Sequence, residues 1–179
     1  TAIASGAVTT TVARALVPGW NAVALTVDPS TPLSASVTCT SIDQTGGAGT
    51  LIEISRLQSG AWDTYRCGVN TNDFGILPGT GYLFKARRAA TWTTTGRPLS
   101  APAGYLPSVG WNLVGPGYVP TGATADWLFT DADNQATGIG RVTEAARFWA
   151  GGTDPTLRAI PANRFTLAAG TAYLIRVEP

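Results

Sequence analysis

Hydrophobic and polar residues alternate over short stretches of this chain, and glycine and proline separate one stretch from the next. Between Leu51 and Leu57, for example, apolar Ile54 is flanked by polar Glu53 and Ser55. This texture is typical of short β-strands joined by turns. We expect strands at residues 22–27, 51–57, 62–69, 81–86, 91–95, 112–115, 141–149, 157–160 and 172–177.

Helical patterning is confined to two stretches, residues 32–42 and 123–131. In the second stretch, Thr124 stands where an N-cap residue would satisfy the free amides of a first helical turn. The sequence therefore predicts a mainly β fold with at most one short helix in each half of the chain.

The whole pattern occurs twice, at an offset of 91 residues. Gly19-Trp20-Asn21 returns as Gly110-Trp111-Asn112, and Gly79-Thr80 returns as Gly170-Thr171. Further identities at this offset pair Glu53 with Glu144, Arg56 with Arg147, Asp63 with Asp154, Phe74 with Phe165 and Tyr82 with Tyr173. Because a repeated pattern indicates a repeated supersecondary unit, we expect two tandem homologous β repeats, barrel- or sandwich-like, related by a pseudo-twofold axis.

A proline-rich stretch at residues 97–107 places the boundary between the repeats near residue 99. The first repeat is then 1–98 and the second 99–179. Residues 5–12 are rich in threonine, like residues 91–95 of the first copy, and the second copy stops before its own equivalent. The strand at 5–12 either completes the second repeat, which would close exposed sheet edges, or simply begins the first.

Charge is sparse, with 13% charged residues and a net charge of +1. Binding to a phosphate backbone needs a basic stripe, so we expect no nucleic-acid partner. No apolar stretch is long enough for a membrane-spanning helix, so we expect no membrane insertion. The chain begins with Thr and shows no signal-peptide pattern, which favours a processed product.

Cys39 and Cys67 both lie in the first copy; the positions matched to them at the 91-residue offset are Thr130 and Arg158. A chain rich in Thr, Ser and Gly with few charges favours a disulfide between them. Such a bond would close a loop of roughly 28 residues and stabilise the fold by about 3 kcal/mol in the chain-entropy model. The alternative is a pair of buried free thiols, which pack as small apolar residues.

The aromatic residues divide into two groups. Those repeated in both copies are expected in the core: Trp20, Trp111, Phe74, Phe165, Tyr82 and Tyr173. Others have no aromatic counterpart at the offset, and most of them are our candidates for a binding surface: Trp62, Tyr65, Trp92, Tyr118, Trp127 and Trp149, with Tyr105 as a further member of the group. Exposed aromatic rings stack on sugars and anchor protein partners, but many such residues in small β domains simply pack.

No strong catalytic or metal-binding motif is present in the sequence. The chain contains no His, which is the commonest general base and metal ligand. Glu53 and Arg56, like Glu144 and Arg147, are spaced for structural ion pairs. The glycine-rich stretches at 46–49 and 137–140 are interpreted as hairpin turns rather than phosphate cradles.

An acidic and amide cluster near the second helix is the one candidate for a cation site. It consists of Asp126, Asp131, Asp133 and Asn134. Calcium prefers such oxygen ligands, but the residue spacing does not follow the EF-hand pattern. A solvated loop is the alternative, and we predict no metal.

Two segments resemble a repeat found in bacterial and archaeal secreted and cell-surface proteins. The segment at residues 18–25 matches its opening Gly-Trp-Asn strand, and the segment at 77–86 matches its closing Pro-Gly-x-Gly-Tyr strand. The second copy is similar at residues 109–115 and, more loosely, at 169–177, where Ala172-Tyr173 replaces the Gly-Tyr pair. The resemblance implies a secreted β module that serves surface attachment, adhesion or spacing, and it implies no activity.

These observations predict a non-catalytic binding or structural module, not an enzyme, with no cofactor. We expect it to be extracellular or at a cell surface, with a protein or polysaccharide of a surface or extracellular assembly as its partner. Two alternatives stay open. One is a carbohydrate-binding module that uses exposed aromatics, and the other is a structural protein of a virion or appendage.

Overall fold

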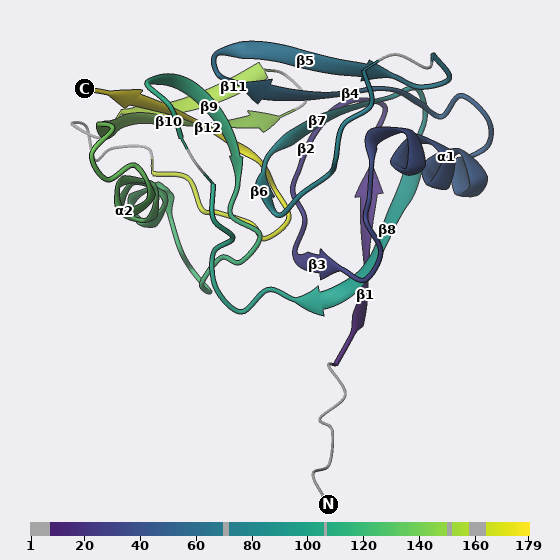
Figure 1. Cartoon of the computed structure of the whole chain (residues 1–179), viewed down its shortest axis with the longest axis horizontal. Helices are drawn as coiled ribbons and strands as arrows, with labels where there is room; N and C mark the ends of the chain where they lie inside the picture. Colours follow the sequence, from purple (N-terminus) through teal and green to yellow (C-terminus); the bar gives the residue numbers. More distant parts are fainter. Residues whose placement is uncertain (1–7, 70–71, 106, 150–151, 158–163) are drawn as a thin grey trace, which may run out of the picture.

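The computed structural model describes residues 8–69, 72–105, 107–149, 152–157 and 164–179, with the backbone alone for Trp149 and for 152–157. It is mainly β, with two helices, as the sequence predicts. The helices are α1 (Ala35–Gly46) and α2 (Ala125–Gln135), and they lie at opposite sides of the molecule with the sheets between them (Figure 1).

The strands form three antiparallel sheets. The N-terminal sheet has the order β1 (Thr10–Leu16), β8 (Ala90–Pro98), β3 (Val27–Pro29). The first-half sheet has the order β2 (Gly19–Val23), β7 (Tyr82–Ala86), β4 (Leu51–Gln58), β5 (Ala61–Arg66). The second-half sheet has the order β11 (Gly152–Leu157), β10 (Arg141–Trp149), β12 (Tyr173–Glu178), β9 (Gly110–Gly115), β6 (Gly79–Thr80).

Most predicted elements are present with shifted ends. Both helices form where expected, although each runs about one turn further. The strand predicted at 157–160 is misplaced, because β11 begins at Gly152 and ends at Leu157, while 158–160 lie outside the described residues. The strand predicted at 22–27 ends at Val23, and the chain then turns into β3.

The order and register of the strands recur at the 91-residue offset. β2, β4, β5 and β7 correspond to β9, β10, β11 and β12, and each set pairs in the same order. Even the irregularity recurs, because a bulge falls between Leu51 and Glu53 in β4 and between Val142 and Glu144 in β10. A common origin and a pseudo-twofold axis remain our prediction from this recurrence.

The helices follow a slightly different offset. Their N-cap residues, Ser34 and Thr124, are 90 residues apart. The buried positions obey the same spacing: Ala35, Thr38, Cys39 and Ile42 in α1, and Ala125, Leu128, Phe129 and Ala132 in α2. The position that matches Cys39 is therefore Phe129 rather than Thr130, so a buried ring stands in the second half where the first half has a disulfide.

The predicted disulfide is present. Cys39 in α1 is bonded to Cys67, which directly follows β5, with their Cα atoms 5.7 Å apart. The bond ties the helix to the edge strand of the first-half sheet. A structural disulfide is typical of proteins that fold in an oxidising environment.

The two halves exchange short segments. Gly79 and Thr80, which form β6, pair with Gly115 and Val114 of β9 in the second half. In return, the Gly170 carbonyl accepts a hydrogen bond from the Ala24 amide at 2.9 Å. Each half thus adds backbone to the other, at β9 in the second half and directly after β2 in the first, so the halves are interlocked.

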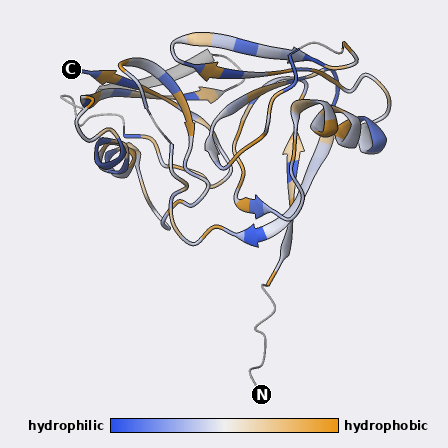
Figure 2. Cartoon of the chain, in the orientation of Figure 1, coloured by the Kyte–Doolittle hydropathy of each residue, from blue (hydrophilic) through white to orange (hydrophobic). Residues whose placement is uncertain are grey.

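Three apolar clusters fill the molecule. One lies within the first half and one within the second. The third joins the two sheets face to face and consists of Leu83, Leu113 and Ala172, with Ala22, Leu57, Phe148 and Leu174 packed at its edge. Hydrophobic and hydrophilic positions alternate along the strands (Figure 2), as expected when one face of each strand is buried.

The N-terminal strand belongs by its pairing to the first half. β1 pairs along its length with β8, from Thr10 opposite Gly96 to Leu16 opposite Ala90. It begins at Thr10, whereas the strand was expected at 5–12, of which 5–7 lie outside the described residues. β1 contacts the second half through Arg14, which donates a hydrogen bond to the Thr171 hydroxyl. The division into repeats 1–98 and 99–179 remains a prediction.

Candidate functional site

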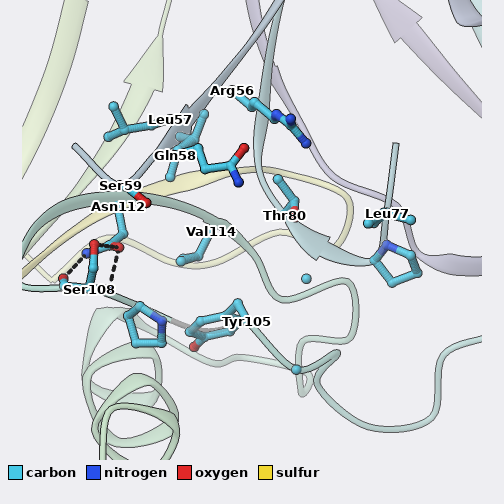
Figure 3. A pocket seen from close by; sticks show the side chains of 15 residues that line it. Arg56, Leu57, Gln58, Ser59, Leu77, Thr80, Tyr105, Ser108, Asn112 and Val114 are labelled. Atoms are coloured by element: carbon cyan, nitrogen blue, oxygen red, sulfur yellow. Dashed lines mark hydrogen bonds between the residues drawn. The ribbon is translucent and has the colours of Figure 1, made fainter. Parts of the chain in front are cut away.

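A cleft of about 400 Å³ opens where the two halves meet. Its upper wall is the β4–β5 hairpin, represented by Arg56, Leu57, Gln58 and Ser59 (Figure 3). The other walls are residues 77–80, the connecting segment represented by Gly104, Tyr105, Pro107 and Ser108, and residues 112–114 of β9. Two of these walls come from the first half and two from the second, so neither half forms this cleft alone.

Asn112 lines the cleft, but its side-chain amide already makes hydrogen bonds within the protein. Its Oδ1 accepts from the Ser108 amide at 2.8 Å, and its Nδ2 donates to the Ser108 carbonyl at 2.7 Å and the Gly110 carbonyl at 3.0 Å. Asn21 makes the same bonds with Val17 and Gly19. The repeated Gly-Trp-Asn motif is therefore explained by folding, because its Asn closes the turn before the first strand of each half.

Tyr105 forms the floor of the cleft with its ring. Its hydroxyl points away and donates to Asp131 Oδ2 at 2.6 Å, while its amide donates to Gln135 Oε1 at 2.7 Å. Burial, together with the hydrogen bond to Asp131 and its charge, holds the pKa of Tyr105 well above the ordinary value. Tyr105 thus presents an apolar ring to the cleft and keeps its proton.

Arg56 is the cationic residue in the lining. Its guanidinium is bound to Asp63 at 2.8 Å and stacks over the Phe74 ring, 4.3 Å from the centroid. The ion pair predicted between Glu53 and Arg56 is wrong, because residues three apart on a strand point to opposite faces. Glu53 instead pairs with Lys85 at 3.3 Å.

Gln58 and Ser59 offer polar groups that the described residues do not bind. Both are exposed at the tip of the β4–β5 hairpin, and Figure 3 shows the Gln58 amide directed into the space between Thr80 and Val114. Trp62 lies on the same hairpin, directly opposite Leu57 of the cleft wall, and its side chain is 52% exposed. The same hairpin thus carries an exposed indole and, in the wall of the cleft, an amide and a hydroxyl; Trp62 itself is not among the residues that line the cleft.

The structure separates the other predicted binding residues. Tyr118 is exposed, Trp127 is half-buried against the core of the second half, and the side chain of Trp149 lies outside the described residues. Tyr65 and Trp92 are each 3% exposed and belong to the core of the first half. They pack in this core and present no surface; the Trp92 ring, for example, lies against the Phe84 ring with centroids 5.0 Å apart.

Two aromatics expected in the core are at the surface instead. Trp20 is 45% exposed and Trp111 is 36% exposed, whereas Phe74, Phe165, Tyr82 and Tyr173 are buried as predicted. The tryptophans are the second residues of β2 and β9, directly after the glycine that opens each strand. Trp20 is covered on one side by Lys85, whose Nζ is 5.0 Å from the ring centroid.

The three carboxylates of the predicted acidic cluster each bind a different protein group. Asp126 pairs with Arg164 at 2.9 Å, and Asp133 accepts from the Val142 amide at 2.8 Å. Asp131 accepts from Tyr105 and Gln135. Within the described part of the chain, no three side chains of His, Cys, Asp or Glu gather closely enough to hold a metal ion.

The glycine-rich stretches at 46–49 and 137–140 each connect a helix to a strand. The prediction that they are hairpin turns between two strands is therefore wrong. Asp43 of α1 reaches over the first of them and accepts from the amides of Gly49 and Thr50. Gly47 and Gly138 have φ of 89° and 79°, where a glycine is favoured. These glycines shape the exit of each helix.

None of the helices in the described residues is long and apolar enough to span a membrane. Comparison with protein-family models, curated proteins and solved structures found no match to this chain.

Proposed function

We propose that the chain is a non-catalytic binding module of a cell surface or extracellular assembly, and that its ligand is a neutral polysaccharide. The observation that carries this proposal is the position of Trp62 opposite Leu57, which sets an exposed ring at the edge of a cleft shared by both halves. A sugar ring could stack on the indole while its hydroxyls meet Gln58 and Ser59.

The charge of the lining favours a neutral ligand. Arg56 is neutralised by Asp63, and the rest of the lining is apolar or carries only hydroxyl and amide groups. A polyanion would find no free cation on these walls, whereas a sugar needs only donors, acceptors and apolar surface. Uncharged polar groups on an apolar cleft are typical of small-ligand sites.

The same lining favours binding over hydrolysis. Glycoside hydrolysis ordinarily uses two carboxylates that flank the scissile bond. The described residues that line the cleft include neither Asp nor Glu. Asp63 is the acidic partner of Arg56 in the cleft wall. Its Oδ2 accepts from Arg56 and its Oδ1 accepts from Asn72, so both carboxylate oxygens are bound by protein groups.

A location outside the cell rests on two further features. The Cys39–Cys67 disulfide fits an oxidising compartment. The resemblance of the Gly-Trp-Asn and Pro-Gly-x-Gly-Tyr segments to repeats of secreted surface proteins points the same way. We infer that the chain attaches to or spaces a surface by holding a glycan.

A glycan array, followed by calorimetric titration of any hit, tests the proposal. Trp62→Ala and Gln58→Ala are each expected to weaken binding about tenfold or more, since one stacked ring or one buried hydrogen bond is worth 1–2 kcal/mol. Trp20→Ala is the matched control. Trp20 is similarly exposed but lies on β2, at the opposite edge of the first-half sheet from Trp62 on β5. Binding that survives in Trp62→Ala, or an array without any hit, would refute the proposal; ordered assemblies in electron micrographs would then favour the structural alternative.

A further inference from the structure

A second, smaller cavity lies on the other side of the junction between the halves. It has a volume of about 120 Å³ and is lined by β1, by Ala24 and Thr26, by Trp92 and Thr94, and by the Ala169–Gly170 turn of the second half. Roughly 10–15 Å³ of such space holds one water molecule, so this cavity has room for several waters or a small ligand. Arg14 is the charged residue in its wall.

The guanidinium of Arg14 is held in place by neutral groups. Its Nη2 donates to the Ala22 carbonyl at 3.1 Å and to the Thr171 hydroxyl at 3.2 Å. Its Nη1 lies over Gly170, where an added β-carbon would approach to 2.6 Å, so the glycine leaves the room that this nitrogen occupies. The described residues supply no acceptor to Nη1 or Nε, which leaves three N–H donors unused.

No carboxylate of the described side chains faces Arg14. Acidic side chains with a protein partner elsewhere are Asp28, Asp43, Glu53, Asp63, Asp73, Asp126, Asp131, Asp133 and Glu178. Glu144 and Asp154 lie opposite Arg176 and Arg147 in the second-half sheet. The stretches outside the described residues contain no Asp or Glu.

Burial of the Arg14 charge therefore carries a desolvation cost that no carboxylate among the described side chains offsets. Burial lowers the pKa of Arg14, and the opposing influence comes from Tyr173 rather than from an acid. A guanidinium keeps its proton in proteins, so this direction reports desolvation of a charge that stays in place. Buried charges are ordinarily paired.

The corresponding position in the other half shows that the fold does not require a cation here. Tyr105 lies 91 residues after Arg14 and lines the larger cleft beside Gly79, as Arg14 lines the smaller cavity beside Gly170. The two linings thus share matched positions, and at one of them the larger cleft has a neutral ring where the smaller cavity has a cation.

We propose that the cavity at Arg14 binds a small anion of four or five non-hydrogen atoms or fewer, such as a carboxylate, a sulfate-type oxyanion or a halide. The anion accepts hydrogen bonds from Arg14 and meets the hydroxyls of Thr26 and Thr94 in the same wall. It also bridges the halves, because Arg14 comes from β1 and Gly170 from the second half.

Calorimetric titration of the full chain with sodium acetate, sulfate and chloride, at an ionic strength held constant with gluconate, tests this site. We expect saturable binding in the millimolar range, and the rank of the three anions identifies the preferred class. Arg14→Gln should weaken it about tenfold or more, because charge-assisted hydrogen bonds are lost. Arg14→Lys should retain part of it, and Arg88→Gln, at an exposed arginine, should leave it unchanged.

Backbone amide NMR of the unaltered chain gives a measurement that does not depend on a variant that folds. Saturable shifts confined to Arg14, Gly170 and Thr171 support the site. Absence of saturation by any of the three anions overturns the proposal, and so does equal binding by Arg14→Gln. Shifts spread evenly over the exposed arginines likewise overturn it, because they report general salt screening.

Discussion

Ala24 and Gly115 face each other across the junction of the two halves so closely that a β-carbon on Gly115 would come within 2.5 Å of the Ala24 β-carbon. The Thr80 carbonyl oxygen would be 2.7 Å away as well. Because both neighbours belong to interlocked backbone, neither can move aside at low cost. This contact limits how closely the segment after β2 approaches β9.

We expect Gly115→Ala to lower the free energy of unfolding by about 1–3 kcal/mol, the usual cost of overpacking. Urea denaturation followed by tryptophan fluorescence measures the change. Gly104→Ala is the matched control, because a β-carbon there meets nothing within 4 Å. An unaltered midpoint for Gly115→Ala would show that the sheets can separate locally.

The Gly-Trp-Asn turns make a second prediction. Asn21→Ala and Asn112→Ala should each destabilise the chain by about 1–3 kcal/mol, since backbone groups lose their partners. Asn134→Ala, at an exposed position of α2, should change stability by less than about 0.5 kcal/mol. Thermal melting of the three variants compares them, and equal melting temperatures would contradict a structural role for the motif.

The disulfide leads to a third prediction. Reduction of Cys39–Cys67 should cost about 3 kcal/mol, because the unfolded chain regains the freedom of the loop between them. Urea unfolding with and without a reducing agent measures this loss. A double Cys39→Ala, Cys67→Ala variant should no longer respond to reductant; if it still does, the effect has another source.

The sequence was informative where local pattern and burial coincide. Strand alternation and the N-cap position of Thr124 were read correctly from neighbours in sequence. The expected capping bond was wrong, because the Thr124 side chain makes no hydrogen bond to the first turn of α2. Trp20 and Trp111 were misjudged because their repetition was taken as burial, although the turn that needs Asn21 leaves the neighbouring ring outside. The Glu53–Arg56 pairing failed because three-residue spacing joins side chains on helices and separates them on strands.

The cleft and the small cavity could not be predicted from the sequence, for a different reason. The cleft combines Gln58 with Thr80 and Asn112, and the small cavity combines Arg14 with Gly170, so each depends on contacts between the halves. One signal was available all the same. Aligning the copies at 91 residues sets Arg14 against Tyr105, and a cation opposite a neutral ring marks a place where the halves differ in chemistry.

A pH effect is expected at the start of α1. Burial acts to raise the pKa of Asp73, but hydrogen bonds from the Ser36 hydroxyl and amide and from Ser34 outweigh it and leave the pKa below its ordinary value. A lowered pKa contributes stability above about pH 4, the ordinary range of Asp. That contribution is lost as the pH falls through the folded pKa.

The stability difference between the unaltered chain and Asp73→Asn should therefore shrink on acidification below about pH 4. Urea midpoints collected over a pH series measure it. In a Ser36→Ala background the same comparison should depend much less on pH, since the main donor is gone. A difference that grows on acidification would reverse the sign of the argument.

The exchange of Gly79-Thr80 and Gly170 between the halves changes what the connecting segment does. Once folded, the halves are joined by sheet backbone and by the apolar cluster around Leu83 and Leu113. The peptide link at 99–103 then serves to bring the halves together during folding rather than to hold them afterwards. A chain cut there by a protease would remain one particle, and its two fragments would part only on unfolding.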